Sequence, residues 1–184
     1  MIGALPKSLS VSGQSFAIRS DYRIALNLLD ALSCDDLTNL DKAYLTVKTL
    51  YFDDIPDELF TPAVTAAYQF LDGGDIPKSK PLPVRMIDYK HDEAMLFSAV
   101  NNAAKCEVRA LEYMHWWTFL SYMASSGEGL FSTVMNIRAK LAQGKRLEKH
   151  EREFIAKHKE LVILRSEQEQ REIEQTEEFL RTIT

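Results

Sequence analysis

The segment Glu112–Met123 reads EYMHWWTFLSYM and contains both tryptophans of the chain, two tyrosines and one of the four histidines. It lacks Gly and Pro, so we predict one continuous helix. Helical spacing places Tyr113, Trp117, Leu120 and Ala124 on one face, and His115, Phe119 and Tyr122 on another, with Trp116 leaning toward Leu120. A helix that is apolar on two faces is either the central helix of the core or a core helix that also docks a partner.

Hydrophobic periodicity predicts further helices on both sides of this segment. We expect them at 21–32, at 39–52, from Thr61-Pro62 to Gly73-Gly74, at 88–105 and at 130–141. Apolar residues alternate around Ser12-Gly13-Gln14, which predicts a β-hairpin over residues 8–18. The fold class expected is therefore mainly α: a compact helical domain of about six to seven helices with a small N-terminal β-hairpin and a long C-terminal helix.

The long helix is expected to run from Leu147 to about Thr182, because this stretch contains neither Gly nor Pro. Its first half has an apolar stripe that includes Phe154 and Leu161, whereas Arg165–Glu178 has Ile173 as its only apolar residue. The second half is either a solvated helix end or a helix that orders on a partner or on another copy of the chain.

The length of 184 residues fits one domain. Within it we distinguish a hairpin with three helices (1–72), a Pro/Gly linker loop (73–87), a helical part with the His-Trp-Trp segment (88–164) and a polar C-terminal extension (165–184).

Composition and motifs exclude several classes of function. A net charge of −5 opposes a nucleic-acid-coating role, and no stretch of 18 apolar residues predicts a membrane span. Cys34 and Cys106 form no CxxC pair, so we expect buried, reduced thiols. Phosphate-binding glycine loops and nucleophile elbows are missing, and His150 and His158 do not have zinc-ligand spacing. We therefore expect no enzyme activity, no cofactor and no metal.

Nearly the whole chain, up to about Leu164, resembles the "gene product fifteen" family of long-tailed phages of Gram-positive hosts. Besides Leu5-Pro6 and the hairpin, the matching pieces are Ser20–Arg23, Leu50–Pro56, Phe70–Gly74, Asp88-Tyr89 with Asp92, Tyr113–Phe119 and Ile137-Arg138. The family tends to have Leu at Met114 and Tyr at Ile137, and neither departure threatens the fold.

This resemblance implies a tail-assembly chaperone that binds the tape-measure protein in the host cytoplasm. The alternative is a structural component of the phage tail or of the head–tail junction. Other tail proteins, or a second copy bound through the long helix, are further expected partners; nucleic acid and membrane are not. On the residues themselves we expect partner contacts from an exposed aromatic stripe and from the long helix, namely from His115, Trp116, Phe119, Tyr122, Phe154 and Leu161.

Overall fold

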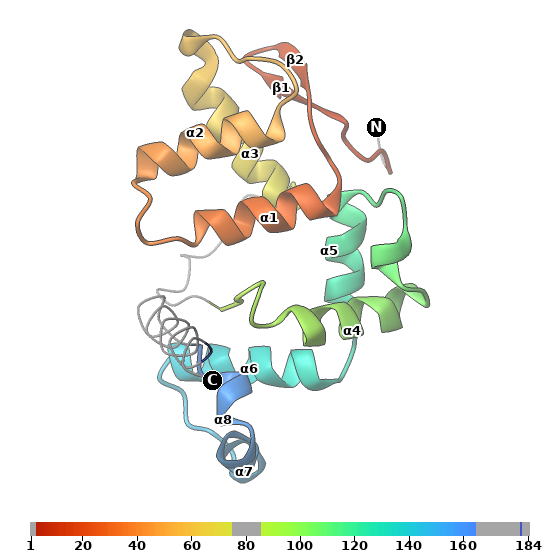
Figure 1. Cartoon of the computed structure of the whole chain (residues 1–184), viewed down its shortest axis with the longest axis vertical. Coiled ribbons are helices and arrows are strands. Elements are labelled where there is room, and N and C mark those ends of the chain that lie inside the picture. Colours follow the sequence, from red (N-terminus) through yellow and green to blue (C-terminus); the bar gives the residue numbers. More distant parts are fainter. Residues whose placement is uncertain (1–2, 75–85, 165–180, 182–184) are drawn as a thin grey trace.

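The computed structural model describes residues 3–74, 86–164 and 181. Within these residues the chain is mainly α-helical with one small antiparallel hairpin, as the sequence predicts (Figure 1). The 75–85 portion of the predicted linker and nearly all of the predicted C-terminal extension lie outside the described residues.

The hairpin consists of β1 (Ser8–Val11) and β2 (Gln14–Ala17). The turn residues Ser12 and Gly13 both have positive φ angles, 49° and 86°, the conformation that matches the twist of a two-residue hairpin. The buried side chain of Val11 and the contact of β1 with α3 attach the hairpin to the helices.

Three helices follow the hairpin: α1 (Tyr22–Leu32), α2 (Asn39–Leu50) and α3 (Phe60–Leu71), the last preceded by a 3₁₀ turn at Asp57–Leu59. Helix α2 ends two residues before the predicted Phe52, because Tyr51 is extended and forms an isolated β-bridge with Ile18. A tertiary contact with the residue that follows β2 therefore ends this helix.

The second part contains α4 (Glu93–Ala104), a 3₁₀ turn at Val108–Ala110, α5 (Trp116–Ala124) and α6 (Leu130–Ala142). Helix α4 begins five residues later than predicted. The carboxylate of Asp88 accepts hydrogen bonds from the backbone N–H groups of Lys90 and His91, which holds 88–92 as a turn.

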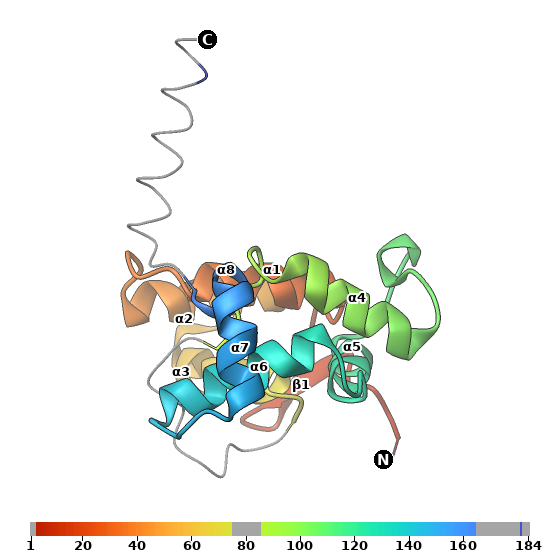
Figure 2. The same cartoon turned by 90° about the horizontal axis from the view of Figure 1, so that it is seen from below.

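The predicted continuous helix from Leu147 is wrong within the described residues. Helix α7 (Lys149–Lys157) stops at His158, and the short α8 (Lys159–Val162) starts in a new direction. Val162 of α8 is buried, and Figures 1 and 2 show α7 and α8 beside α6. Figure 1 shows these helices at the end of the molecule opposite the hairpin. The Lys140 ammonium contacts the Glu151 carboxylate at 2.6 Å and joins α6 to α7.

One hydrophobic cluster contains side chains from both sides of the linker, including Tyr22, Phe70, Phe97 and Phe119. The expectation of two buried thiols is wrong for Cys106, which is exposed, whereas Cys34 is half-buried. Among the described helices, none is both long and apolar enough to cross a membrane.

Candidate functional site

Helix α5 begins inside the segment that was expected to be one helix. Glu112–Met114 are not helical, and His115 is the N-cap residue: its Nδ1 accepts a hydrogen bond from the backbone N–H of Trp117 at 3.0 Å. The proton of the ring therefore resides on Nε2, which donates to the carbonyl of Pro6 at 2.9 Å. His115 thus ties the start of α5 to the N-terminal segment.

The residues before α5 pair with the residues before α1. The N–H of Trp116 donates to the carbonyl of Ser20 at 2.8 Å, and the N–H of Tyr22 donates to the carbonyl of Met114 at 3.0 Å. The Tyr113 hydroxyl lies 2.7 Å from the Ser20 hydroxyl. This short antiparallel bridge, between segments far apart in the sequence, is the physical reason why α5 starts later than its composition predicts.

Both tryptophans bind the last turn of α3. The indole Nε1 of Trp116 donates to the carbonyl of Leu71, and that of Trp117 donates to the carbonyl of Phe70, both at 2.8 Å. Trp116 is 1% exposed, so its indole belongs to the core of the molecule. Phe119 stacks on Tyr22 with a ring separation of 4.7 Å.

The predicted aromatic partner stripe is therefore not an exposed surface. His115, Trp116 and Phe119 are buried because they join α5 to α1, α3 and the N-terminal segment. Tyr122 is half-buried and packs on the same core. The expectation of exposure is wrong for His115 and Phe119, and a partner contact with any of the three buried residues would require α5 to leave its place.

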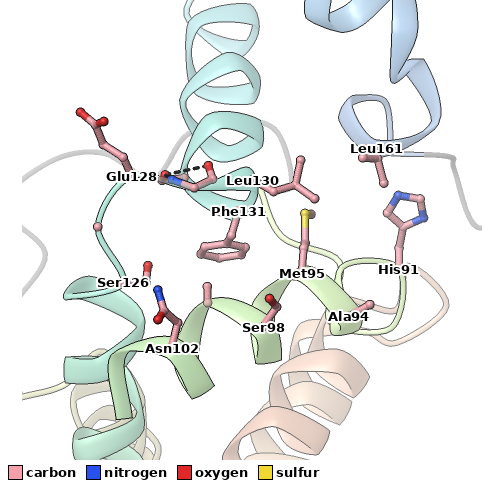
Figure 3. A pocket seen from close by; sticks show the side chains of 14 residues that line it. His91, Ala94, Met95, Ser98, Asn102, Ser126, Glu128, Leu130, Phe131 and Leu161 are labelled. Atoms are coloured by element: carbon pink, nitrogen blue, oxygen red, sulfur yellow. Dashed lines mark hydrogen bonds between the residues drawn. The ribbon is translucent and has the colours of Figure 1, made fainter. Parts of the chain in front are cut away.

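The two predicted residues of the long helix have different surroundings. Phe154 is half-buried on α7, and its ring lies 4.8 Å from that of His158. Leu161 is half-buried on α8 and lines the surface cavity shown in Figure 3. Of the six predicted partner residues, only Leu161 borders this cavity.

We call this cavity, of about 460 Å³, the α4–α6 groove. Its floor is one face of α4, and its walls are the loop before α6, the start of α6 and Leu161. The lining side chains named in Figure 3 are His91, Ala94, Met95, Ser98, Asn102, Ser126, Glu128, Leu130, Phe131 and Leu161. Small side chains alternate along the floor with the apolar ones, while Leu130 remains 47% exposed at the rim.

One end of the groove has an unsatisfied polar atom. The Nε2 atom of His91 is buried and has no hydrogen-bond partner among the described residues; the nearest acidic oxygen, Oδ1 of Asp92, is 3.9 Å away. Figure 3 shows the His91 ring next to Leu161. In the part of the chain that the structure describes, no three His, Cys, Asp or Glu side chains form a metal-binding group. The arrangement is that of a mainly apolar groove with a buried polar atom at one end.

A buried ion pair holds this end in place. Arg138 of α6 contacts both carboxylate oxygens of Asp92, with Nη1–Oδ2 at 2.5 Å and Nη2–Oδ1 at 2.9 Å. Its remaining N–H groups donate to the carbonyls of Met86, Leu161 and Val162. All five guanidinium donors are used, so one side chain joins the residue before α4 to the last two residues of α8.

Sequence reasoning did not find this network, although a signal exists. Arg138 lies in the same helical stripe as Val134 and Leu141, where a charge implies a buried partner. Asp92 was noted only as part of a family resemblance.

Comparison with known proteins supports that resemblance. The family model described as "Bacteriophage Gp15 protein" matches residues 1–164, which is most of the chain. Neither the curated proteins nor the solved structures gave a match. The matched region includes the buried aromatic residues, the Asp92–Arg138 pair and the α4–α6 groove, and the chain therefore belongs to the bacteriophage Gp15 family, whose members are structural, head–tail-related phage proteins.

Proposed function

We propose that the protein is a tail-assembly chaperone that covers an apolar helical stripe of the phage tape-measure protein during assembly in the host cytoplasm. The observation that carries the proposal is the open α4–α6 groove, with its apolar walls and its floor of small side chains. Recognition of an amphipathic helix in an apolar groove is a common mode of peptide binding. A long helical chain with an unpaired apolar stripe would otherwise aggregate.

The dimensions of the groove suit a short helical segment. The α4 residues of its floor extend from Ala94 to Asn102, which corresponds to roughly 12 Å or two helical turns. Ala94, Ser98 and Ala99 have little side-chain volume, so the backbone of a bound helix can approach α4 closely.

The larger side chains of the groove suit apolar anchors. Met95 and Phe131 form an apolar base, and Leu130 and Leu161 stand at the rims. The flexible thioether of Met95 can adapt to different apolar side chains, which favours a repetitive partner over one unique sequence.

The alternative is a structural component that stays in the tail or at the head–tail junction. The family assignment favours it as well, because it indicates a head–tail-related protein without specifying a chaperone. The two functions differ in one observable: a chaperone is absent from purified virions, whereas a structural component is present in fixed copy number.

Co-expression with the tape-measure protein tests the chaperone function. We expect the partner to be soluble and recovered in a complex with the wild-type chain. Ala94→Glu and Ser98→Glu place a charge in the groove at exposed positions of α4, so the fold should persist while the complex is lost. Ala156→Glu, at an exposed position of α7 outside the groove, is the matched control.

The outcomes separate clearly. Equal recovery with Ala94→Glu and Ala156→Glu excludes the α4–α6 groove as the binding site. A tape-measure protein that is equally soluble alone, with no complex recovered, contradicts the chaperone function and leaves the structural component.

A further inference from the structure

A second surface groove lies on another part of the molecule, where β2 leads into α1 and approaches the start of α5. Its volume is about 440 Å³, and it is lined by Lys7, Ile18, Arg19, Ser20, Asp21, Ile24, Phe52 and Tyr113. We call it the Phe52–Tyr113 groove. It shares no residue with the α4–α6 groove, so its role is independent of the proposed chaperone site.

Two large aromatic side chains form its walls and remain unusually accessible. Phe52 is 60% exposed and Tyr113 is 47% exposed. Both are held in place: the Tyr113 hydroxyl contacts Ser20, and the N–H of Phe52 donates to the carbonyl of Ala17. Rigid, exposed aromatic side chains are typical anchors of protein interfaces, because little conformational entropy is lost when they are covered.

A positive charge lies over each of these rings. The Lys7 ammonium is 6.0 Å from the centre of the Tyr113 ring, and the Arg19 guanidinium is 4.6 Å from the centre of the Phe52 ring. Among the described residues neither cation forms a salt bridge, whereas the carboxylate of Asp21 is engaged by Arg23 and by backbone N–H groups. The groove therefore combines aromatic walls with a cationic rim, which favours an acidic segment with aromatic or aliphatic anchors.

The C-terminal sequence of this chain has that chemistry. Residues 165–184 include six glutamates and three arginines, a net charge of −3, and their apolar residues are concentrated near the end. The sequence Glu177-Glu178-Phe179-Leu180 places two carboxylates directly before an aromatic and an aliphatic side chain.

We propose that the C-terminal segment of a second copy of the chain docks in the Phe52–Tyr113 groove, with Phe179 and Leu180 against the aromatic walls and the glutamates near Lys7 and Arg19. The second copy is favoured because α8, the last described helix before this segment, lies away from the hairpin end of the molecule (Figure 1). Reciprocal exchange of the two segments produces a closed, twofold-symmetric dimer.

The test uses the full chain and measures its mass in solution over a wide concentration range by sedimentation velocity. The wild-type chain is expected to form a dimer as concentration rises. Phe52→Ala should weaken dimerisation at least roughly thirtyfold, the scale of a lost aromatic anchor. Leu40→Ala removes a similarly exposed apolar side chain on α2 and serves as the control.

Charge reversal identifies the bound segment. Lys7→Glu alone, and Glu177→Lys with Glu178→Lys, should each weaken dimerisation roughly tenfold, and the combination of all three should restore it. Lys7 is chosen because its side chain is exposed, while Arg19 also binds carbonyls at the end of α2.

Three results would overturn the proposal. One is a wild-type chain that stays monomeric at every concentration. This result would overturn the proposal even if the C-terminal segment of the same chain filled the Phe52–Tyr113 groove. Another is a dimer that persists when Phe179 and Leu180 are both replaced by Asp. The third is a failure of the combined charge reversal to restore the dimer while each reversed chain remains folded.

Discussion

Two regions of this molecule hold distant segments together in different ways. We call the first region the aromatic junction; it consists of Tyr51, Trp116 and Trp117. Each of these side chains donates one hydrogen bond to a backbone carbonyl of α3. At the second, a single charged side chain, Arg138, donates to three carbonyls and one carboxylate. Both regions satisfy buried carbonyls, but the aromatic side chains also bury large apolar areas.

This difference predicts different roles. Apolar burial stabilises the fold directly, in proportion to the area removed from water. A buried ion pair contributes little net stability, because desolvation offsets the attraction, yet the loss of one partner leaves the other charge uncompensated. We therefore expect the aromatic junction to determine global stability and the Asp92–Arg138 pair to determine the position of α8 at the groove.

The largest effect is expected from Trp116→Ala. The substitution removes a fully buried indole and leaves the carbonyl of Leu71 without its donor, so the free energy of unfolding should fall by roughly 3–5 kcal/mol. Chemical denaturation measures it, with Tyr113→Ala at the half-exposed end of the same segment for comparison. Equal losses in both variants would show that α5 is not central to the core.

Arg138→Ala is expected to cost about 3 kcal/mol, because the buried Asp92 carboxyl group loses its partner and three carbonyls lose their donor. The loss should concentrate in α7 and α8, where amide hydrogen exchange should accelerate more than in α1 or α3. Arg152→Ala, an exposed arginine on α7, is the matched control. Uniform acceleration across all helices would contradict the local role.

The two regions also differ in how far sequence could predict them. The apolar pattern around Trp116 correctly predicts a buried helix, because burial follows from local composition and helical period. The pattern does not predict the position of the first turn: histidine is not a preferred N-cap residue, and the bridge with Asp21 that stops the helix is a tertiary contact.

The α4–α6 groove could not be predicted, for a related reason. Ala94, Ser98 and Ala99 are ordinary small residues of a helix, and they become a groove floor only because the loop before α6 and Leu161 stand at its sides. The placement of Leu161 depends in turn on Arg138, whose partners are distant in the sequence. Functional surfaces that arise between elements leave no local periodicity.

Gly74→Ala tests the edge of the aromatic junction and should cost about 2 kcal/mol. Its φ of 88° disfavours a side chain, and an added Cβ would lie 2.9 Å from the Trp117 ring. Gly144→Ala separates the cost of the positive φ angle from the cost of the contact with Trp117. Gly144 also has a positive φ, but an added Cβ there would meet open space. A cost equal to that of Gly144→Ala would mean that the Trp117 ring moves freely and that the junction is not tightly packed there.

The smallest effect concerns Tyr51, whose buried hydroxyl donates to the carbonyl of Ala63 at 2.9 Å. Burial raises the pKa of Tyr51 from 10.0 to about 12, so the folded chain retains this proton at a pH where the unfolded chain releases it. The contribution of Tyr51 to stability should be complete below about pH 10 and decline from there to about pH 12.

Tyr51→Phe should cost about 1 kcal/mol near neutral pH, and this cost should shrink with rising pH because phenylalanine has no proton to release. Other tyrosines and lysines titrate in the same range, but they are common to both chains and cancel in the difference. Urea denaturation of the two chains at several alkaline pH values measures that difference. A constant difference across the range would show that the hydroxyl is solvated, and that Tyr51 does not belong to the dry part of the aromatic junction.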